Sequence, residues 1–380
     1  MIFSMPSITK LEEKYVLDAM HTFPISGDGK YTKRVYEIFK NRFGMDNMLL
    51  TTSGTAALEM AGLLIGLDKG DEVIAPSFTF SSTINAFMLR GAKPVFCDIR
   101  EDTYNIDEER IESLITPKTK AIYCVNYAGV SCDIDRINEI ADKHGLFVIE
   151  DAAQSVGSTY KGKPSGTLTE LGCFSFHETK NYVMGEGGAL VVNEDKYMQR
   201  AEIIREKGTN RSMLIRGLVD KYTWWDIGSS YLPSDILAAV LTAQMERFDE
   251  IMEHRMGIWN SYQAAFEDAE KKGWLRRPII PEGITHNGHM YNILLPDEKS
   301  RIYLSEELKK KSIPAYICYV PLHSSPMGKK LGYTEADCPV TQDCGTRLLR
   351  LPLSAMLTRE ETMQVIENTY DVLRKMNGGH

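Results

Sequence analysis

The sequence contains no long hydrophobic run and no excess of basic residues. Charged residues interrupt its apolar stretches well before the roughly 20 residues that a membrane-spanning helix requires. Lysine and arginine together number 44 against 52 aspartates and glutamates, which gives a net charge of −8. We therefore expect no nucleic-acid partner and no membrane partner, although a local basic pocket for a phosphorylated small molecule is compatible with this balance.

Paired cysteines are also missing. The odd set of seven contains no CxxC pair and no zinc spacing, which predicts neither a disulfide framework nor a metal site (Cys97, Cys124, Cys132, Cys173, Cys318, Cys338 and Cys344). Residues 1–15 lack a basic stretch followed by an apolar one, so we expect no secretory signal. These absences are typical of a soluble cytoplasmic protein with reduced thiols.

The sequence does contain an alternation of short apolar runs and longer amphipathic segments. With 380 residues, 43% of them hydrophobic, the chain is long enough for two domains. Strands are predicted over 48–52, 72–75, 94–98, 121–125, 146–150, 173–176 and 189–192, and helices over 53–65, 81–90, 107–114 and 133–144. Strands that alternate with helices predict an α/β fold with a mostly parallel sheet.

A change of pattern predicts a second, smaller domain. One helical stretch over 233–267 is long enough to leave the first domain and enter the next. Beyond Trp274, strands are predicted over 290–295 and 315–320, and helices over 304–311 and 359–376. We therefore predict a large α/β domain over residues 1–250 and a small C-terminal α+β domain over 251–380.

Candidate ligand-binding residues follow the predicted strands, at the edge where open α/β sheets bind ligands. Ser53, Gly54 and Thr55 begin the helix after the first strand, where backbone N–H groups and the positive end of the helix dipole suit a phosphate. The alternative for Ser53 is an ordinary helix N-cap. Phe80 follows the second strand and is placed to stack on a planar ring, although such an aromatic residue is more often part of the core.

Two charged residues extend this set. Asp151 ends a buried strand, where a cation such as a protonated pyridine nitrogen would keep its carboxylate ionised; an N-cap or a salt bridge is the alternative. Lys180 lies between another strand and the glycine turn 185–188, where it could trap a carbonyl group or be an ordinary surface lysine. A phosphate cradle, a stacking aromatic, a carboxylate for a ring nitrogen and a Schiff-base lysine together suit pyridoxal 5′-phosphate.

In two of these motifs, Glu150–Gln154 and Ser175–Gly188, the sequence resembles the DegT/DnrJ/EryC1/StrS family of sugar-nucleotide aminotransferases, and the resemblance covers nearly the whole chain. It implies a fold-type-I transferase that depends on pyridoxal phosphate. It also implies that Lys180 forms the Schiff base and moves protons, and that Asp151 pairs with the pyridinium nitrogen. The other cofactor contacts that it implies are Gln154 near the ring oxygen, Phe80 on the ring face, and Ser53, Gly54, Thr55 and Ser175 at the phosphate.

The resemblance further implies substrates and an assembly. L-glutamate is the implied amino donor, and a dTDP-linked 4-keto-6-deoxy sugar is the implied acceptor, aminated at C4 for surface polysaccharide biosynthesis. The implied homodimer shares its active sites, and Ser230 stands where many members have an asparagine that reaches the phosphate in the partner subunit. Asn126 replaces a histidine of many members in a loop that helps to set substrate choice, and His323 matches a position near the active site that suggests a substrate contact.

Several alternatives stay open at this point. An enzyme of the same family could act on another nucleotide-linked ketosugar, with GDP or UDP, or at C3. A 3-dehydratase on this fold would carry histidine in place of Lys180. A non-catalytic sugar-nucleotide sensor would have little need for Asp151, Gln154 and Lys180 together, and the lack of a GxGxxG motif after the first strand disfavours a Rossmann oxidoreductase.

Overall fold

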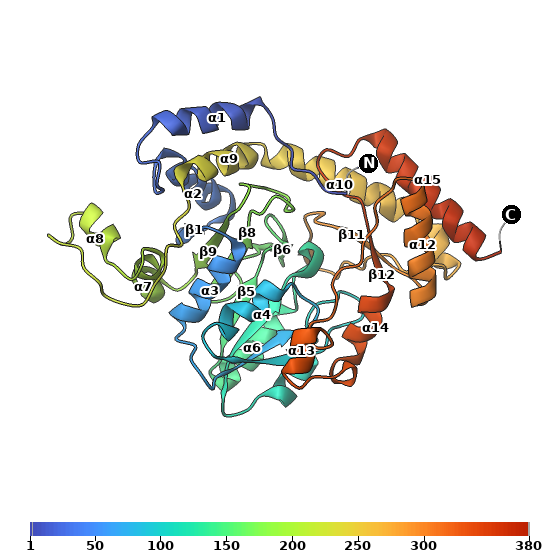
Figure 1. Cartoon of the computed structure of the whole chain (residues 1–380), viewed down its shortest axis with the longest axis horizontal. Coiled ribbons are helices and arrows are strands. Elements are labelled where there is room, and N and C mark those ends of the chain that lie inside the picture. The colour runs from blue at the N-terminus through green and yellow to red at the C-terminus, as the bar shows by residue number, and fades with distance from the viewer. Residues whose placement is uncertain (2, 379–380) are drawn as a thin grey trace.

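A seven-stranded sheet forms the centre of the large domain (Figure 1). The computed structural model describes residues 1 and 3–378. The strands lie in the order β1-β9-β8-β5-β4-β2-β3, and only β9 runs antiparallel to its neighbours. Their bounds are β1 (Met48–Thr51), β2 (Glu72–Pro76), β3 (Lys93–Cys97), β4 (Thr119–Val125), β5 (Phe147–Asp151), β8 (Leu171–Ser175) and β9 (Gly188–Val192). The predicted α/β fold with a mostly parallel sheet is confirmed.

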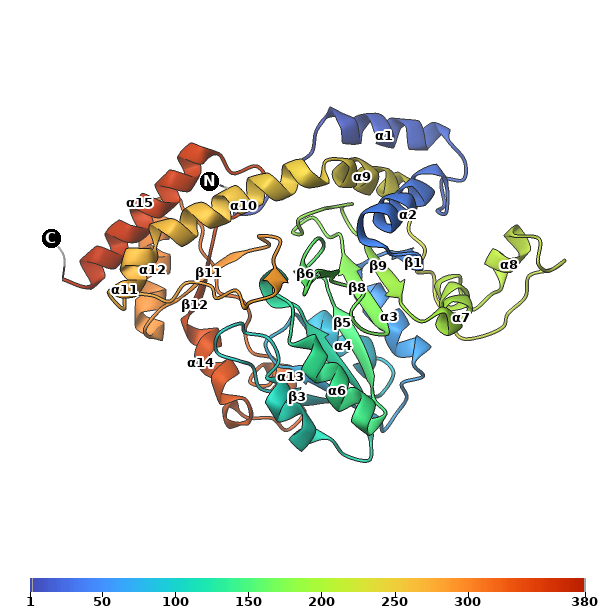
Figure 2. The same ribbon diagram turned by 180° about the vertical axis from the view of Figure 1, so that it is seen from behind.

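Helices cover both faces of this sheet, which is why its strands are apolar throughout rather than alternating. Three helices pack on one face, α3 (Gly54–Leu64), α4 (Ser81–Met88) and α7 (Asp195–Arg205). The other face is covered by α2 (Lys30–Phe43), α5 (Glu108–Ile111), α6 (Ile134–His144) and α9 (Asp235–Glu246). Figure 2 shows α6 in front of the strands.

The N-terminal helices α1 (Lys10–His21) and α2 are absent from the predicted elements. α1 begins at a capping box in which Thr9 and Glu12 exchange hydrogen bonds. It buries little besides Glu12 and Ala19, while Leu17 and Met20 remain exposed. Its apolar side chains therefore do not mark a buried face.

The long helix predicted over 233–267 is broken in the structure. α9 ends at Glu246, and α10 (Phe248–Ala265) begins after Arg247, whose φ of −99° and ψ of 19° are not helical. The Arg247 guanidinium bonds the Ser7 carbonyl and hydroxyl and pairs with Glu12, which ties the break to the N-terminal segment. The two helices follow one another along the top of Figure 1 and connect the two domains.

The small domain has its own core, which begins at Ile258 on α10. Its antiparallel pair is β11 (Tyr291–Leu294) and β12 (Leu348–Leu351), covered by α12 (Glu298–Lys310) and α15 (Arg359–Met376). The remaining elements of the chain are β6 (Thr159–Tyr160), β7 (Lys163–Pro164), β10 (Ile284–Thr285), α8 (Arg211–Ile215), α11 (Glu267–Lys271), α13 (Pro326–Lys330), α14 (Pro339–Arg347), η1 (Glu112–Leu114), η2 (Tyr127–Gly129) and η3 (Glu335–Asp337). A domain boundary at residue 250 stays a prediction.

The strand predicted over 315–320 is wrong. Only Tyr316 pairs with β12, through a bridge to Arg350. After this bridge the chain turns toward the large domain, where the Tyr319 hydroxyl accepts a hydrogen bond from Gln154. The apolar character of this segment therefore does not mark a ladder, and Tyr316, Ile317 and Val320 are exposed.

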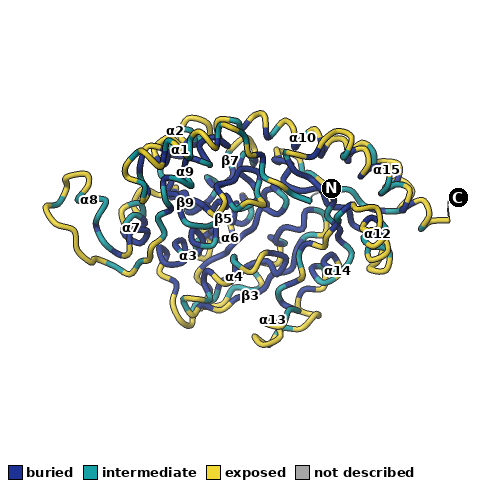
Figure 3. Tube along the Cα trace, turned by 45° about the horizontal axis from the view of Figure 1, so that its top comes forward, coloured by how far each residue is buried: buried dark blue, intermediate teal, exposed yellow. Residues whose placement is uncertain are grey.

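The segment around α8 stands away from the body of the protein (Figures 1 and 2) and is largely exposed (Figure 3). Its exposed apolar side chains are Ile215, Leu218, Tyr222, Trp224, Trp225 and Ile227. In the part of the chain that the structure describes, no helix has the length and apolar character needed to cross a membrane.

Candidate active site

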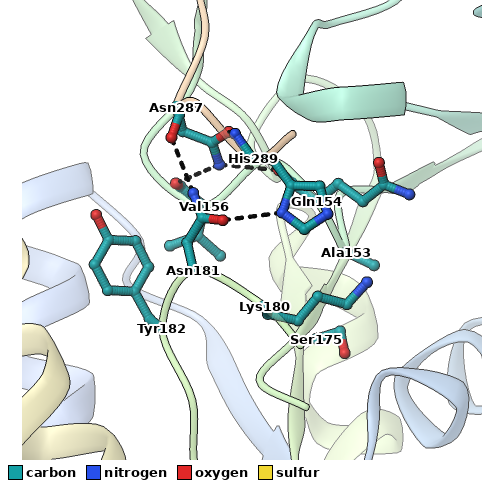
Figure 4. A pocket seen from close by; sticks show the side chains of 9 residues that line it. All are labelled: Ala153, Gln154, Val156, Ser175, Lys180, Asn181, Tyr182, Asn287 and His289. Carbon is teal, nitrogen blue, oxygen red and sulfur yellow. Dashed lines mark hydrogen bonds between the residues drawn. The ribbon is translucent and has the colours of Figure 1, made fainter. Parts of the chain in front are cut away.

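Several of the predicted site residues lie at the carboxyl end of the parallel strands, where β5 and β8 end and α3 begins. A small pocket opens at this edge between the large domain and the loop that precedes β11. Figure 4 shows its lining, which consists of Ala153, Gln154, Val156, Ser175, Lys180, Asn181, Tyr182, Asn287 and His289. Lys180 and Ser175 thus come together with Gln154, as expected from their positions after neighbouring strands.

Asp151 is the last residue of β5 and is 5% exposed. Its Oδ2 accepts a hydrogen bond from the Thr83 hydroxyl at 2.7 Å, and its Oδ1 accepts one from the Ala153 N–H at 3.2 Å. No described residue forms an ion pair with it, and burial raises the pKa of its carboxyl above the usual range. A buried carboxylate held only by two neutral donors fits a cationic ring nitrogen, which would restore its ionised form.

Lys180 lies in the loop after β8, where its side chain is half-buried. Its amine forms no hydrogen bond or ion pair with the residues that the structure describes. Burial lowers the pKa of the amine, Asp151 opposes this, and the positive charge of Arg350 adds to the lowering. A lysine with a lowered pKa has more of the neutral form that attacks a carbonyl carbon, so this residue fits a Schiff-base lysine.

The predicted phosphate cradle lies where the start of α3 closely approaches the end of β8 and the start of β9. A Cβ on Gly54 would lie 2.7 Å from the Cβ of Ser175, and a Cβ on Gly188 would lie 2.4 Å from the carbonyl oxygen of Ser53. Ser53 is the N-cap of α3, since its Oγ accepts from the Ala56 N–H at 3.0 Å, and Thr55 bonds to Ser82. The positive end of α3 beside the Ser175 hydroxyl fits a phosphate group.

We expect Gly54→Ala to weaken binding of pyridoxal phosphate by about tenfold or more, because the new methyl group must displace Ser175 from the cradle. Fluorescence titration of the apoprotein measures the Kd. Gly257→Ala is the matched control, since this exposed helical glycine has no atom within 4 Å of a new Cβ. An unchanged Kd for Gly54→Ala would contradict the assignment of the cradle.

Gln154 lines the pocket, whereas Phe80 is not among its lining residues. The Gln154 side chain accepts from the Ala128 N–H at 2.7 Å and donates to the Tyr319 hydroxyl at 2.8 Å, so both ends of its amide are held. Phe80 is the N-cap residue of α4 and is 60% exposed, with its ring centroid 6.3 Å from that of Tyr319. Stacking of Phe80 on a ring stays a prediction.

Ser230 and His323 lie outside the pocket lining. Ser230 is exposed and forms an isolated bridge with Glu206, and the next residue, Tyr231, accepts a hydrogen bond from the Thr52 N–H. His323 is fully buried, and its Nδ1 lies 2.6 Å from the Ser77 hydroxyl. A phosphate contact for Ser230 and a substrate contact for His323 stay predictions.

Asn126 supports the pocket from beneath. Its amide donates to Glu150 at 2.7 Å, and its Oδ1 accepts from the Cys132 N–H at 3.1 Å. Burial raises the pKa of Glu150 to about 7. This buried pair fixes the strand end that carries Asp151, so the structure places Asn126 under the site rather than in its lining.

Six of the nine lining residues were not among the predicted site residues, namely Ala153, Val156, Asn181, Tyr182, Asn287 and His289. The Asn287 amide donates to the carbonyls of Gln154 and Val156, and Asn181 bonds to both Asn287 and His289. Asn287 and His289 are brought to the pocket by the small domain, more than 100 residues after Lys180. The polar run 286–289 before the predicted strand at 290 was the only sequence signal for them.

The charge around the pocket is positive. The positive charges of Lys180, Arg255 and Arg350 all lower the pKa of His289. None of the three cations forms an ion pair within the described residues. Arg255 instead donates to the carbonyls of Gly288 and His289. Such a site suits anionic ligands, including phosphates and carboxylates.

Known proteins resemble this chain over almost its full length. Residues 6–369 match the model of the DegT/DnrJ/EryC1/StrS aminotransferase family. The spore coat polysaccharide biosynthesis protein SpsC of Bacillus subtilis is 32% identical over 380 residues, which cover 98% of this chain and 97% of that protein. GDP-perosamine synthase of Caulobacter vibrioides is 33% identical over 370 residues, which cover 97% of each chain.

Solved structures show the same fold. A protein of Streptococcus pneumoniae described as a sugar aminotransferase has a TM-score of 0.92 in its PMP form, with 26% identity and 99% of each chain covered. Its PLP form has a TM-score of 0.91 with the same identity and coverage. These neighbours share with this chain a fold that binds the pyridoxal cofactor.

Proposed function

The chain belongs to the DegT/DnrJ/EryC1/StrS aminotransferase family, and on that premise we propose that it transfers the amino group of L-glutamate to C4 of a dTDP-linked 4-keto-6-deoxy-D-glucose. That it is a sugar aminotransferase dependent on pyridoxal phosphate follows from the family and its relatives. The donor, the nucleotide and the position on the sugar are the proposed part. The product would be dTDP-4-amino-4,6-dideoxy-D-galactose, for surface polysaccharide biosynthesis.

The observation that carries the proposal is that a buried carboxyl group and a partly buried amine lie at one sheet edge, neither with an ion-pair partner among the described residues. The charge of Asp151 is opposed only by that of Lys180, with no ion-pair contact between them, and both lie beside the close contact of Gly54 with Ser175. A binding protein has little need for either group, whereas transamination uses both.

When bound, pyridoxal phosphate supplies an electron sink for the reacting carbon and carries the amino group between the two substrates. Asp151 would hold the ring nitrogen protonated, and Gly54, Thr55 and Ser175 would hold the phosphate. As a neutral amine, Lys180 would take a proton from the donor carbon, and as an ammonium it would deliver a proton to the acceptor carbon. L-glutamate would leave as 2-oxoglutarate before the sugar enters the same pocket.

The choice of the dTDP sugar is supported by the stretches Ser175–Tyr182, Glu202–Ser212 and Val219–Tyr231, which carry the resemblance to transaminases of that substrate. A second candidate is a GDP-linked 4-keto-6-deoxy sugar, because relatives at 32–33% identity are named GDP-perosamine synthase. Both candidates keep C4 as the reacting carbon.

A homodimer with shared active sites is part of the proposal. It is supported by the exposed position of Ser230 and by the apolar side chains of the protruding segment around α8, which a second copy of the chain would cover.

The test follows the visible spectrum of the cofactor-loaded enzyme. We expect the absorption band to bleach with L-glutamate and, after the donor is removed, to return with dTDP-4-keto-6-deoxyglucose, with NMR of the product showing the amino group at C4. Return of the band only with the GDP-linked sugar would favour the second candidate. An enzyme that never binds the cofactor would contradict the whole assignment.

A further inference from the structure

His289 is a buried residue of the pocket that the proposed mechanism leaves without a role. It lies two residues before β11, is 6% exposed and lines the pocket with Lys180 (Figure 4). Its Nδ1 is 2.9 Å from the Oδ1 of Asn181, the residue that follows Lys180. Its position is therefore fixed relative to the reactive lysine.

The hydrogen bonds of Asn181 determine which nitrogen of His289 carries the proton. The Asn181 Nδ2 donates to the Asn287 carbonyl at 2.9 Å, and a carbonyl can only accept. The Oδ1 of Asn181 therefore faces His289, and Nδ1 of the imidazole must be the donor. Burial and the positive charges of Lys180, Arg255 and Arg350 lower the pKa of His289 well below its usual value, so the ring is neutral.

A neutral ring protonated at Nδ1 has a lone pair at Nε2. Among the residues that the structure describes, none donates a hydrogen bond to this atom, while the ring borders the pocket. Figure 4 shows the imidazole above the Lys180 side chain and beside Gln154. The Nε2 atom is thus an acceptor that is available to a hydrogen-bond donor of a ligand.

Besides the hydrogen bond of its side chain, His289 is held through its backbone, which makes this acceptor rigid. Its N–H donates to the Asn287 Oδ1 at 3.1 Å, and the Asn287 amide donates to the Gln154 and Val156 carbonyls at 2.9 and 3.0 Å. The loop of the small domain is therefore tied to the loop that carries Gln154. A rigid acceptor can discriminate between ligands, because no rearrangement relieves a mismatched group.

The two substrates differ in what they offer to such an atom. Away from its reacting amino group L-glutamate offers only carboxylates, which are acceptors and repel a lone pair, whereas sugar hydroxyls can donate. We propose that Nε2 of His289 accepts a hydrogen bond from a hydroxyl group of the sugar acceptor and so determines specificity in the second half of the reaction. This inference rests on the proposed function only in requiring a hydroxylated ketosugar as acceptor.

Two amide variants distinguish the roles of the two ring nitrogens of His289. The amide nitrogen of His289→Asn can replace Nδ1 toward Asn181 but offers nothing at Nε2, whereas the amide oxygen of His289→Gln can reach the Nε2 position. For His289→Asn we expect the melting temperature and the rate of the half-reaction with L-glutamate to stay close to wild type. We expect kcat/KM for the ketosugar to fall about tenfold or more, with partial recovery in His289→Gln.

A binding measurement needs no turnover. Calorimetry on the cofactor-loaded enzyme should show that His289→Asn weakens dTDP-glucose about tenfold but leaves dTDP unchanged, since only the former carries the hydroxyls of the hexose. Equal weakening of both ligands, equal loss in both half-reactions, or an unchanged kcat/KM for the sugar would overturn the inference. If the wild type aminates only the GDP-linked sugar, the proposed nucleotide is wrong, and GDP-mannose against GDP decides the inference in the same way.

Discussion

Lys180→Ala is expected to abolish amino transfer, with a loss of at least about four orders of magnitude, because the variant loses both the nucleophile and the proton carrier. The variant should bind pyridoxal phosphate without the absorption band of the lysine-bound form. Its fold should remain intact, since the amine forms no hydrogen bond or ion pair with other described residues. The measurements are single-turnover spectra with L-glutamate and the melting temperature of the apoprotein.

Two controls bracket this result. Lys180→Arg keeps the positive charge but should be equally inactive, because a guanidinium does not deprotonate near neutral pH. Lys161→Ala removes an exposed lysine that pairs with Asp135 and should retain full activity. Normal turnover by either Lys180 variant would exclude it as the Schiff-base residue.

Asp151→Asn is expected to lower kcat by about two to three orders of magnitude, because a neutral amide cannot keep the ring nitrogen protonated. In the apoprotein the same change should not destabilise the fold, and at neutral pH it should raise the melting temperature. Folded Asp151 has a raised pKa, so it binds its proton more tightly than the unfolded chain does. Wild-type stability therefore falls as the pH rises from the ordinary carboxyl range through the raised pKa, while the variant lacks this loss.

The comparison of wild type and variant at two pH values checks this sign. At a pH below the ordinary carboxyl range both forms are neutral at this position, so the difference in melting temperature should shrink. Asp249→Asn, at an exposed carboxylate that pairs with Arg42, provides the control for a general charge effect. A variant with wild-type kcat would remove Asp151 from the catalytic set.

Much of the fold could be predicted because buried parallel strands are continuous apolar runs and the helices between them are amphipathic. α15 over Arg359–Met376 matches its prediction at both ends, since a capping box marks its start. The exceptions have physical reasons. α1 exposes apolar side chains that a pattern would place inside, and so does the segment 315–320, where Tyr316, Ile317 and Val320 are exposed.

The site residues, too, include some that the sequence could predict and some that it could not. Lys180 and Asp151 could be proposed because each follows a strand, and the sheet itself brings strand ends together. Asn287 and His289 could not, because their place depends on how the small domain packs against the large one, which no local pattern encodes. The orientation of Gln154 also depends on this packing, through Tyr319.

α10 has a consequence for how the protein unfolds. Phe248 and Ile251 near its start belong to the core beneath the central sheet, whereas Ile258, Trp259 and Tyr262 further along belong to the core of the small domain. Unfolding of α10 removes packing from both cores, because both depend on one continuous run of helical hydrogen bonds. The two domains should therefore melt in a single cooperative calorimetric transition rather than in two.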